Sequence, residues 1–147
     1  GEGDGFWLRY RGGGVPWPPR DERLVILGDA NLDPIDGDGK RGAIRALLEH
    51  PDLQDPQPKS AGAVQAALAQ GGINARHRGD PALDTADWRD RNGPGNLRVD
   101  YVLPSRDLKV LDAGVFWPAP NEADAATLRD RDPSVSWHGL VWVDIAR

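Results

Sequence analysis

Residues 24–33 read LVILGDANLD, and this stretch decides the expected fold. The four apolar residues 24–27 are too few for a helix and have no polar face. Such a run is typical of a strand that is buried on both sides in a layered fold. Gly28 ends the strand, because a residue without Cβ lets the backbone turn sharply. Asp29 and Asn31 are therefore expected just past the carboxyl end of the strand, where layered α/β proteins bind their ligands.

A lone G-D-x-N pattern is equally compatible with ordinary turn hydrogen bonds. Two later segments favour a functional site. Residues 97–105 read LRVDYVLPS and residues 135–145 read VSWHGLVWVDI, and each resembles a strand with one polar residue in a notable place. These polar residues are Asp100 and His138. An Asp and a His can form a hydrogen-bonded pair in which the carboxylate orients the imidazole ring.

The order G-D-x-N, R-V-D-Y-V-L and S-x-H-x-L-V resembles the second half of the endonuclease/exonuclease/phosphatase superfamily. These are the magnesium-dependent phosphoesterases related to DNase I, AP endonucleases, sphingomyelinases and inositol polyphosphate phosphatases. The resemblance extends over residues 23–145, nearly the whole chain. It implies an α+β fold, namely half of a four-layer α/β/β/α sandwich with a mainly antiparallel sheet and outer helices. Residues 24–147 would be the C-terminal part of such a domain, after an irregular segment at residues 1–23.

The resemblance also implies roles for individual residues. Asp29 would orient or deprotonate the attacking water, Asn31 would donate to a phosphoryl oxygen, and His138, held by Asp100, would contact the phosphate. The implied cofactor is Mg²⁺, or Mn²⁺ or Ca²⁺ in its place, with Asp29 and Asn31 as ligands. The principal metal ligand, a Glu, is expected in an N-terminal half that this sequence lacks.

One position departs from the family pattern. The residue before the His is commonly Asp in the family, whereas Trp137 stands here. An indole ring cannot bind Mg²⁺, which requires hard oxygen donors. Two functions therefore remain open: a metal-dependent phosphate-ester hydrolase in the full-length parent, with this chain weak or inactive alone, and a non-catalytic binding module that has lost the metal-dependent chemistry.

The residues before Asp100 are expected to form the rim of a substrate site. Residues 71–96 are rich in Gly, Pro and charge, and a long irregular stretch of this kind is usually functional or disordered. We expect the substrate-binding residues here to be Arg76, His77, Arg78 and Trp88, with Thr85 and Asp87 beside them. The alternative is a solvated basic turn that pairs with Asp80 and Asp84.

A calcium loop is a further alternative for the first motif. Asp29, Asn31 and Asp33 have the spacing of the first three EF-hand ligands, but Pro34 stands where the loop needs Gly and Lys40 where it needs Glu. These two mismatches exclude an EF-hand. The remaining acids of the turn, Asp36 and Asp38, are candidates for a surface cation site.

Composition limits the functions further. The 147 residues, 39% apolar with six Trp, are enough for one domain with a core, and the absence of Cys excludes disulfides and thiolate metal sites. A net charge of −5 does not favour nucleic acid over other phosphate esters. No apolar run approaches the roughly 20 residues of a membrane span. The composition is that of a soluble domain, and it leaves the compartment open, including export of the parent.

Periodicity predicts the remaining elements. Residues 41–50 have the i, i+3, i+4 apolar spacing of an amphipathic helix, and residues 61–70 are a second helix that ends at two glycines. Residues 108–117 are expected as the hairpin partner of the preceding strand, and residues 121–131 are weakly helical. Since the helices cover only the outer side of the sheet, we expect an apolar inner face that the missing N-terminal half or a second copy must cover.

Overall fold

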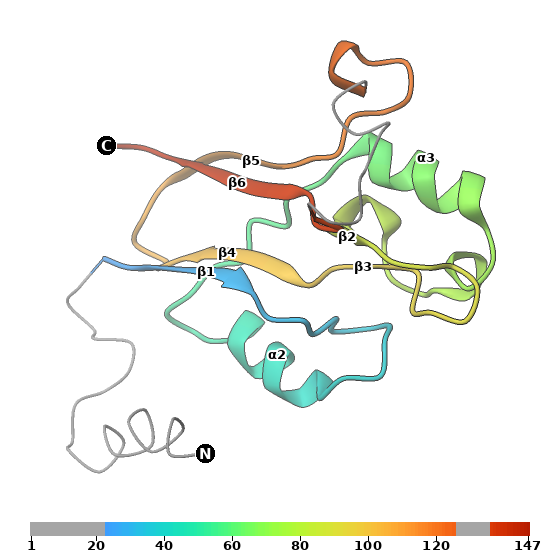
Figure 1. The fold of residues 1–147 in the computed structure, drawn as a ribbon. Coiled ribbons are helices and arrows are strands. Elements are labelled where there is room, and N and C mark those ends of the chain that lie inside the picture. Colours follow the sequence, from blue (N-terminus) through green and yellow to red (C-terminus); the bar gives the residue numbers. More distant parts are fainter. Residues whose placement is uncertain (1–22, 126–135) are drawn as a thin grey trace.

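The structure is a computed structural model that describes residues 23–125 and 136–147. The irregular segment expected at residues 1–23 lies outside the described residues, apart from Arg23. In chain order the elements are β1 (Val25–Asp29), α2 (Arg41–Leu48), α3 (Ala61–Gln70), the 3₁₀ turns η2 (Asn74–Arg76) and η3 (Pro81–Leu83), β2 (Ala86–Asp87), β3 (Asn96–Leu97), β4 (Asp100–Pro104), β5 (Val110–Phe116), η4 (Ala123–Ala125) and β6 (Leu140–Ile145) (Figure 1).

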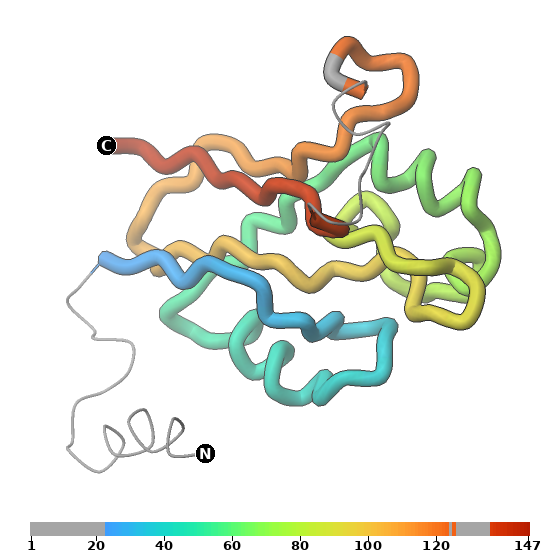
Figure 2. The backbone as a smooth tube through the Cα atoms, viewed as in Figure 1, coloured from blue at the N-terminus to red at the C-terminus, as the bar shows by residue number. Residues whose placement is uncertain are grey.

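The strands of the described residues form three antiparallel pairs, β1 with β4, β2 with β3 and β5 with β6. The expected α+β class with antiparallel sheets is confirmed. In β1 and β4, Leu27 lies opposite Val102 and Asp29 lies opposite Asp100. Figure 2 shows these two strands, blue and gold, side by side although they are far apart in the sequence. Pairing of distant segments thus brings the first two motifs together.

The expectation that the three motif strands share one sheet is wrong for the described residues. The strand β6 pairs with β5, and β5 is not the hairpin partner of β4. The segment between α2 and α3 occupies hydrogen-bonding positions on both strands. Gln54 donates its backbone N–H to the oxygen of Pro104, and Val115 donates to the oxygen of Lys59. This segment therefore takes the positions that a hairpin between β4 and β5 would use.

The helix α2 covers one face of the β1–β4 pair. Its buried Ile44 packs with Tyr101 and Leu103 of β4, and Ile26 of β1 packs against the same cluster. The amphipathic pattern thus predicted this helix correctly, although it ends two residues before the expected position. A helix with one apolar face stabilises the sheet through this contact more than through its own propensity.

The opposite face of the same pair is open, and the expectation that β1 is buried on both sides is wrong. The side chain of Leu27 is 71% exposed. Alternation explains this, because Ile26 points toward α2 and its neighbour must then point to the other face. An apolar run in the sequence therefore does not show that both faces are covered in this part of the fold.

The helix α3 packs against the β5–β6 pair, with Ala63 in a buried cluster with Val115 and Trp117. Its bounds match the predicted ones. Ser60 caps the amino end by accepting from the backbone of Gly62 and Ala63, and its hydroxyl donates to the oxygen of Trp117. Each of the two larger sheets thus carries one helix, and the described residues do not form the second sheet layer of the expected sandwich.

The stretch at residues 71–96 was expected to be irregular, but it contains short helical turns and strands. Side-chain hydrogen bonds hold these elements in place. Asn74, which is buried, accepts a hydrogen bond of 2.8 Å from the backbone N–H of Asn96. The amide of Gln70 joins the same network. These contacts are tertiary, and no local pattern signals them. The predicted helix at residues 121–131 lies mostly outside the described residues.

Large apolar side chains are exposed on the face of β5 and β6 that points away from α3. Val115 and Val141 pack toward the helix, so their neighbours along the strands point to the other side. These neighbours are Phe116, Leu140 and Trp142, which are 37%, 66% and 37% exposed. The expectation of an open apolar face is therefore met. None of the described helices is long and apolar enough to cross a membrane.

Candidate active site

Asp29 and Asn31 form a tight turn at the carboxyl end of β1. The carboxylate of Asp29 accepts from the backbone N–H of Asn31 at 2.7 Å and from its side-chain amide at 2.8 Å. Asn31 has a positive φ of 48°, a conformation that Asn tolerates better than most residues. Both residues are exposed. The turn therefore holds the carboxylate in one orientation while leaving it open to a ligand.

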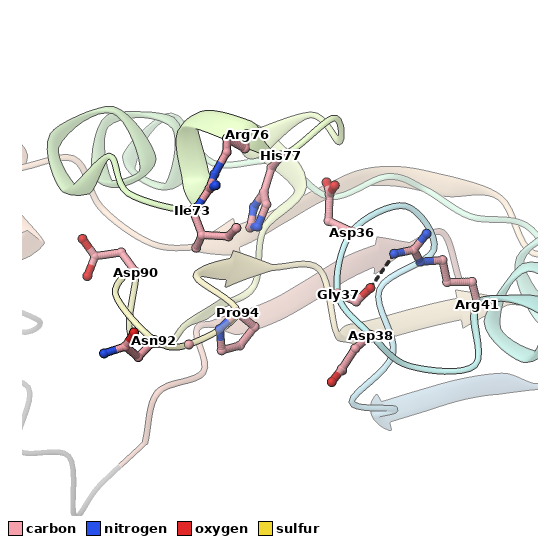
Figure 3. Close-up of a pocket in the computed structure, with 11 residues that line it drawn as sticks. Asp36, Gly37, Asp38, Arg41, Ile73, Arg76, His77, Asp90, Asn92 and Pro94 are labelled. Atoms are coloured by element: carbon pink, nitrogen blue, oxygen red, sulfur yellow. Dashed lines mark hydrogen bonds between the residues drawn. The ribbon is translucent and has the colours of Figure 1, made fainter.

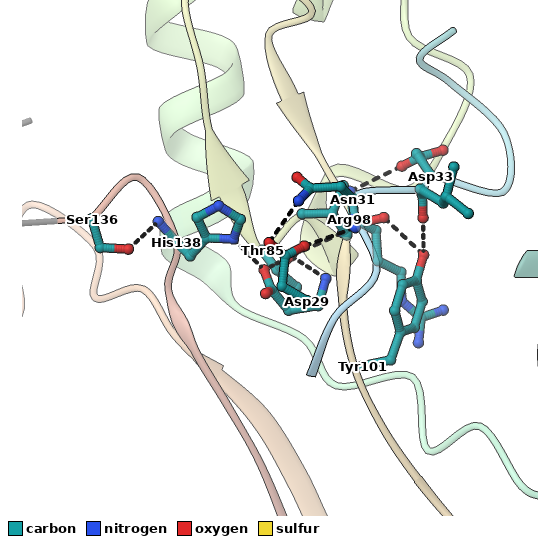
Figure 4. Close-up of polar contacts among 11 residues, drawn as sticks. Asp29, Asn31, Asp33, Thr85, Arg98, Tyr101, Ser136 and His138 are labelled. Carbon is teal, nitrogen blue, oxygen red and sulfur yellow. Dashed lines mark hydrogen bonds and ion pairs between the residues drawn. The ribbon is translucent and has the colours of Figure 1, made fainter. Parts of the chain in front are cut away.

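Asp100 and His138 form the expected pair beside this turn. The Nδ1 atom of His138 lies 2.9 Å from Oδ2 of Asp100, and both side chains are largely buried. Because a carboxylate only accepts hydrogen bonds, Nδ1 carries the proton in this contact. The other ring nitrogen, Nε2, then remains for a ligand. Figure 4 shows the imidazole and the Asp29 turn near each other, on separate segments of the chain.

Two carboxylates and the imidazole converge. Asp29, Asp100 and His138 each offer one ligand atom, and these atoms lie within 4.8 Å of one another. Two carboxylates suit Mg²⁺, which uses one or two protein carboxylates and keeps several waters. The amide nitrogen of Asn31 faces Asp29, so its carbonyl oxygen is not beside that carboxylate. The residues present thus fit a divalent ion through Asp29 and Asp100, and Asn31 as a ligand stays a prediction.

Segment 85–87 joins the pair to the rest of the fold. Ala86 forms an antiparallel bridge with His138, and Asp87 donates its backbone N–H to the oxygen of Trp137 at 2.9 Å. Trp88 meets the ring of His138 edge to face, with centroids 5.4 Å apart and planes at 86°. Trp88 is therefore placed at the candidate site. The carbonyl of Trp137 is used in a structural hydrogen bond.

The other expected rim residues lie elsewhere. Arg76 and His77 line an open hollow of about 760 Å³ together with Asp36, Asp38 and Arg41 (Figure 3). This hollow contains none of the converging residues, and its charges are mixed, since acids and bases line it together. The Asp100–His138 pair is the stronger candidate site, because a carboxylate and an imidazole are in contact there.

Arg78 does not form part of that hollow. Its backbone N–H donates to the carboxylate of Asp36, as does that of Gly79. The alternative of a basic turn paired with Asp80 and Asp84 is not observed for Asp80, whose carboxylate pairs with Lys59 at 2.7 Å. The hydrogen bond from Lys59 lowers the pKa of Asp80 below its usual value.

Asp33, one of the residues that suggested a calcium loop, has a structural role. Asp33 is buried and accepts from the backbone of Ile35, Asp36 and Arg98. These bonds hold the turn after β1 against the start of β4. Arg98 is itself buried, forms a two-pronged ion pair with Asp55 and lies over the ring of Tyr101. Burial of the Tyr101 hydroxyl raises its pKa.

Sequence reasoning placed Thr85 on the rim, and the structure places it inside. Its side chain is fully buried, and its hydroxyl contacts Asp100. A Thr in a polar stretch gives no signal of burial, because the stretch is anchored by distant segments. An account of which buried donors and acceptors are satisfied would have found it.

Comparison with known families gives one match. A family model described as Endonuclease/Exonuclease/phosphatase family matches residues 2–134. The matched range includes Asp29, Asn31 and Asp100, and it ends four residues before His138. Comparison with curated proteins and with solved structures gave no match.

Proposed function

The chain belongs to the endonuclease/exonuclease/phosphatase family, and from this premise we propose that it hydrolyses phosphate esters at the Asp29 turn and the Asp100–His138 pair. The family is generally hydrolytic. One observation carries the proposal: His138 Nδ1 lies 2.9 Å from the Asp100 carboxylate, within reach of a second, exposed carboxylate. A structural Asp–His contact alone would not require that third group.

Each residue has a separate task in this proposal. Asp29 orients the attacking water, since its carboxylate is exposed and fixed by two hydrogen bonds from Asn31. Asn31 uses one hydrogen of its side-chain amide for Asp29 and keeps the second for a phosphoryl oxygen. His138 donates from Nε2 to the phosphate, and Asp100 stabilises the imidazolium that this contact favours.

The proposed cofactor is Mg²⁺. When bound, the ion neutralises charge on the phosphoryl oxygens and orients the substrate. Asp29 and Asp100 are the residues that would hold it. In the described part of the chain the cluster contains two carboxylates and no Glu, so we expect weak affinity and low activity for this chain alone.

A phosphate ester other than duplex nucleic acid is the proposed substrate. The net charge of −5 disfavours a long polyanion, whose binding usually relies on a basic face. Trp88 beside His138 provides an apolar wall on one side of the site. A small ester with an apolar or aromatic leaving group would fit beside this wall.

The second candidate is a binding module without catalysis. Trp137 favours it, because the residue there cannot supply the oxygen that an Asp would supply. Such a module would still bind phosphate through Asn31 and His138. It would not turn over an ester, and its affinity for phosphate would not depend on Asp29.

Hydrolysis of bis-p-nitrophenyl phosphate in the presence of Mg²⁺ separates the two candidates. We expect His138→Gln and Asp29→Asn each to lower kcat by about 10²- to 10⁴-fold, the usual contribution of a proton-transferring group. Asp144→Asn, at an exposed strand position, is the control and should retain the activity. Turnover that is unchanged in the Asp29 variant would contradict the enzymatic proposal.

Phosphate binding without turnover would instead support the binding module. Calorimetric titration of the same variants with inorganic phosphate provides this measurement. Duplex DNA and p-nitrophenyl phosphate as further substrates test the proposed substrate class.

A further inference from the structure

The hydroxyl of Thr85 lies directly beneath the Asp100–His138 pair. The Thr85 side chain has no exposed surface. Its Oγ1 atom is 3.0 Å from the backbone nitrogens of both Val99 and Asp100, and 2.7 Å from Oδ2 of Asp100. Thr85 therefore cannot touch a substrate, but it touches a residue of the proposed site.

The three contacts fix the direction of the hydroxyl. A Thr hydroxyl has one hydrogen to donate and two lone pairs to accept with. The two backbone N–H groups use both lone pairs. The single hydrogen must then go to Oδ2 of Asp100, which as a carboxylate oxygen can only accept. No rotation of the hydroxyl satisfies all three partners in another way.

The same carboxylate oxygen holds the imidazole. Oδ2 of Asp100 accepts from Thr85 and also lies 2.9 Å from Nδ1 of His138. Two donors on one oxygen leave the carboxylate little freedom to turn about its bond to the strand.

The backbone of Thr85 sets the spacing between the two partners. Its N–H donates to the oxygen of Leu97 at 2.9 Å, on the side of β3. Its oxygen accepts from the N–H of Gly139 at 2.7 Å, next to His138. One residue is thus bonded to the segment that carries the carboxylate and to the segment that carries the ring.

We propose that Thr85 is a positioning residue, which locks the Asp100 carboxylate so that it holds His138 with Nδ1 protonated and Nε2 directed outward. The catalytic consequence rests on the proposed function, whereas the effect on the ring does not. Without the hydroxyl, Asp100 could turn away and the ring would lose its fixed tautomer.

Three variants separate positioning from simple structural support. Thr85→Val keeps the shape and removes the hydroxyl, and Thr85→Ser keeps the hydroxyl. The matched control is Ser105→Ala, because Ser105 is also buried, accepts from the backbone N–H of Leu24 and donates to the carboxylate of Asp107 away from the site. Thr85→Val and Ser105→Ala each remove a hydrogen bond from a buried hydroxyl to a carboxylate, and Thr85→Ser preserves it.

The first measurement is NMR of the His138 ring and does not need enzymatic activity. In the unsubstituted chain we expect a downfield Nδ1–H proton signal and nitrogen shifts of a single tautomer. Thr85→Val should lose this signal as Asp100→Asn does, while Thr85→Ser and Ser105→Ala should keep it. A Thr85→Val protein that folds and keeps the signal would overturn the inference.

The unsubstituted chain provides a second test in case Thr85→Val does not fold. Because both donors approach one oxygen, the hydroxyl proton of Thr85 should exchange slowly and give a nuclear Overhauser effect to the Nδ1 proton of His138. Failure to observe this effect, with both protons assigned, would also overturn the inference.

Kinetics connects the ring to the proposed reaction. Thr85→Val should lower kcat by about 10- to 100-fold, the usual effect of removing a group that orients a functional residue. KM should not change, because Thr85 is buried. If Asp100→Asn abolishes turnover and Thr85→Val leaves it intact, the positioning role is wrong. If no variant changes turnover but the ring signal is lost, the proposed function fails and the positioning role stands.

Discussion

Asp84 is a carboxyl group buried among other carboxyl groups. It is 8% exposed, and burial, followed by the charges of Asp33, Asp36 and Asp80, raises its pKa from an ordinary value of 3.8 to about 8. In the unfolded chain the same group ionises near its ordinary pKa. Between these two values the folded protein holds a proton that the unfolded chain has released.

The free energy of unfolding should therefore fall as the pH rises from about 4 to about 8. One proton difference corresponds to at most about 1.4 kcal/mol for each pH unit. Asp84→Asn replaces the carboxyl group with an amide that does not titrate. The stability of the variant relative to the unsubstituted protein should therefore increase as the pH rises and level off above pH 8. Urea unfolding at several pH values measures this difference.

Asp144→Asn is the control for the same series, since Asp144 is exposed. Its stability relative to the unsubstituted protein should not depend on pH in this window. A stability difference for Asp84→Asn that is constant from pH 5 to pH 8 would show that the group is already ionised in the folded state.

At the level of residues, the sequence predicted which polar side chains come close together at the candidate site but not the residues that support them. Asp29 and Asp100 lie at the ends of strands, and Asn31 and His138 lie within two residues of one, so a local pattern of a polar residue beside an apolar run reveals them. Thr85 and Asp33 are recognisable only from the buried donors and acceptors that they satisfy. Those partners lie on segments far away in the chain, and a single sequence does not state which segments meet.

Two helical glycines provide a matched pair at the level of secondary structure. A Cβ on Gly62 of α3 would overlap the carbonyl oxygen of Trp117 and come within 2.7 Å of the carbonyl carbon of Pro118. A Cβ on Gly42 of α2 would meet nothing within 4 Å. Both glycines lie inside helices, where Ala is the better helix former.

Gly42→Ala should therefore stabilise the protein by about 0.5 to 1 kcal/mol, the difference in helix propensity. Gly62→Ala should destabilise it, because α3 must move away from Trp117 and lose packing with β5. Thermal unfolding of both variants measures the two signs. A Gly62→Ala protein as stable as Gly42→Ala would mean that α3 does not contact β5 as closely as described.

Local patterns predicted the helices well and the pairing of strands poorly. The apolar spacing of α2 and the two glycines after α3 are properties of adjacent residues. The strand partner of β5 does not depend on adjacent residues alone, because residues between α2 and α3 occupy the edge with which β4 would have paired. The sequence also did not reveal that one face of β1 is exposed, since an apolar residue is the same in the sequence whether or not another layer covers it.

At the level of the whole molecule, large apolar side chains are exposed close in sequence to the candidate site residues. Leu27 is two residues from Asp29 in the sequence, and Leu140 is two residues from His138. Leu27 and Leu140 are 71% and 66% exposed. Each 100 Å² of apolar area covered would contribute about 2.5 kcal/mol. A surface of this kind favours a partner or a second copy.

The chain should therefore bind a hydrophobic dye and show concentration-dependent light scattering. Leu27→Glu combined with Leu140→Glu should reduce both signals, because the charges disfavour burial of the surface. Leu68→Glu is the control, since Leu68 is a single exposed apolar residue on α3. A compact monomer that binds no dye would show that the surface is covered within the chain.

The pairing of β1 with β4 also constrains how the protein folds. Asp29 faces Asp100 only after the intervening helices and turns have been synthesised, and closing so long a loop slows folding. During synthesis β1 must wait, with its apolar residues unpaired, until β4 leaves the ribosome. Asp29 and Asp100 of the candidate site are therefore brought together only when this long-range strand pair forms.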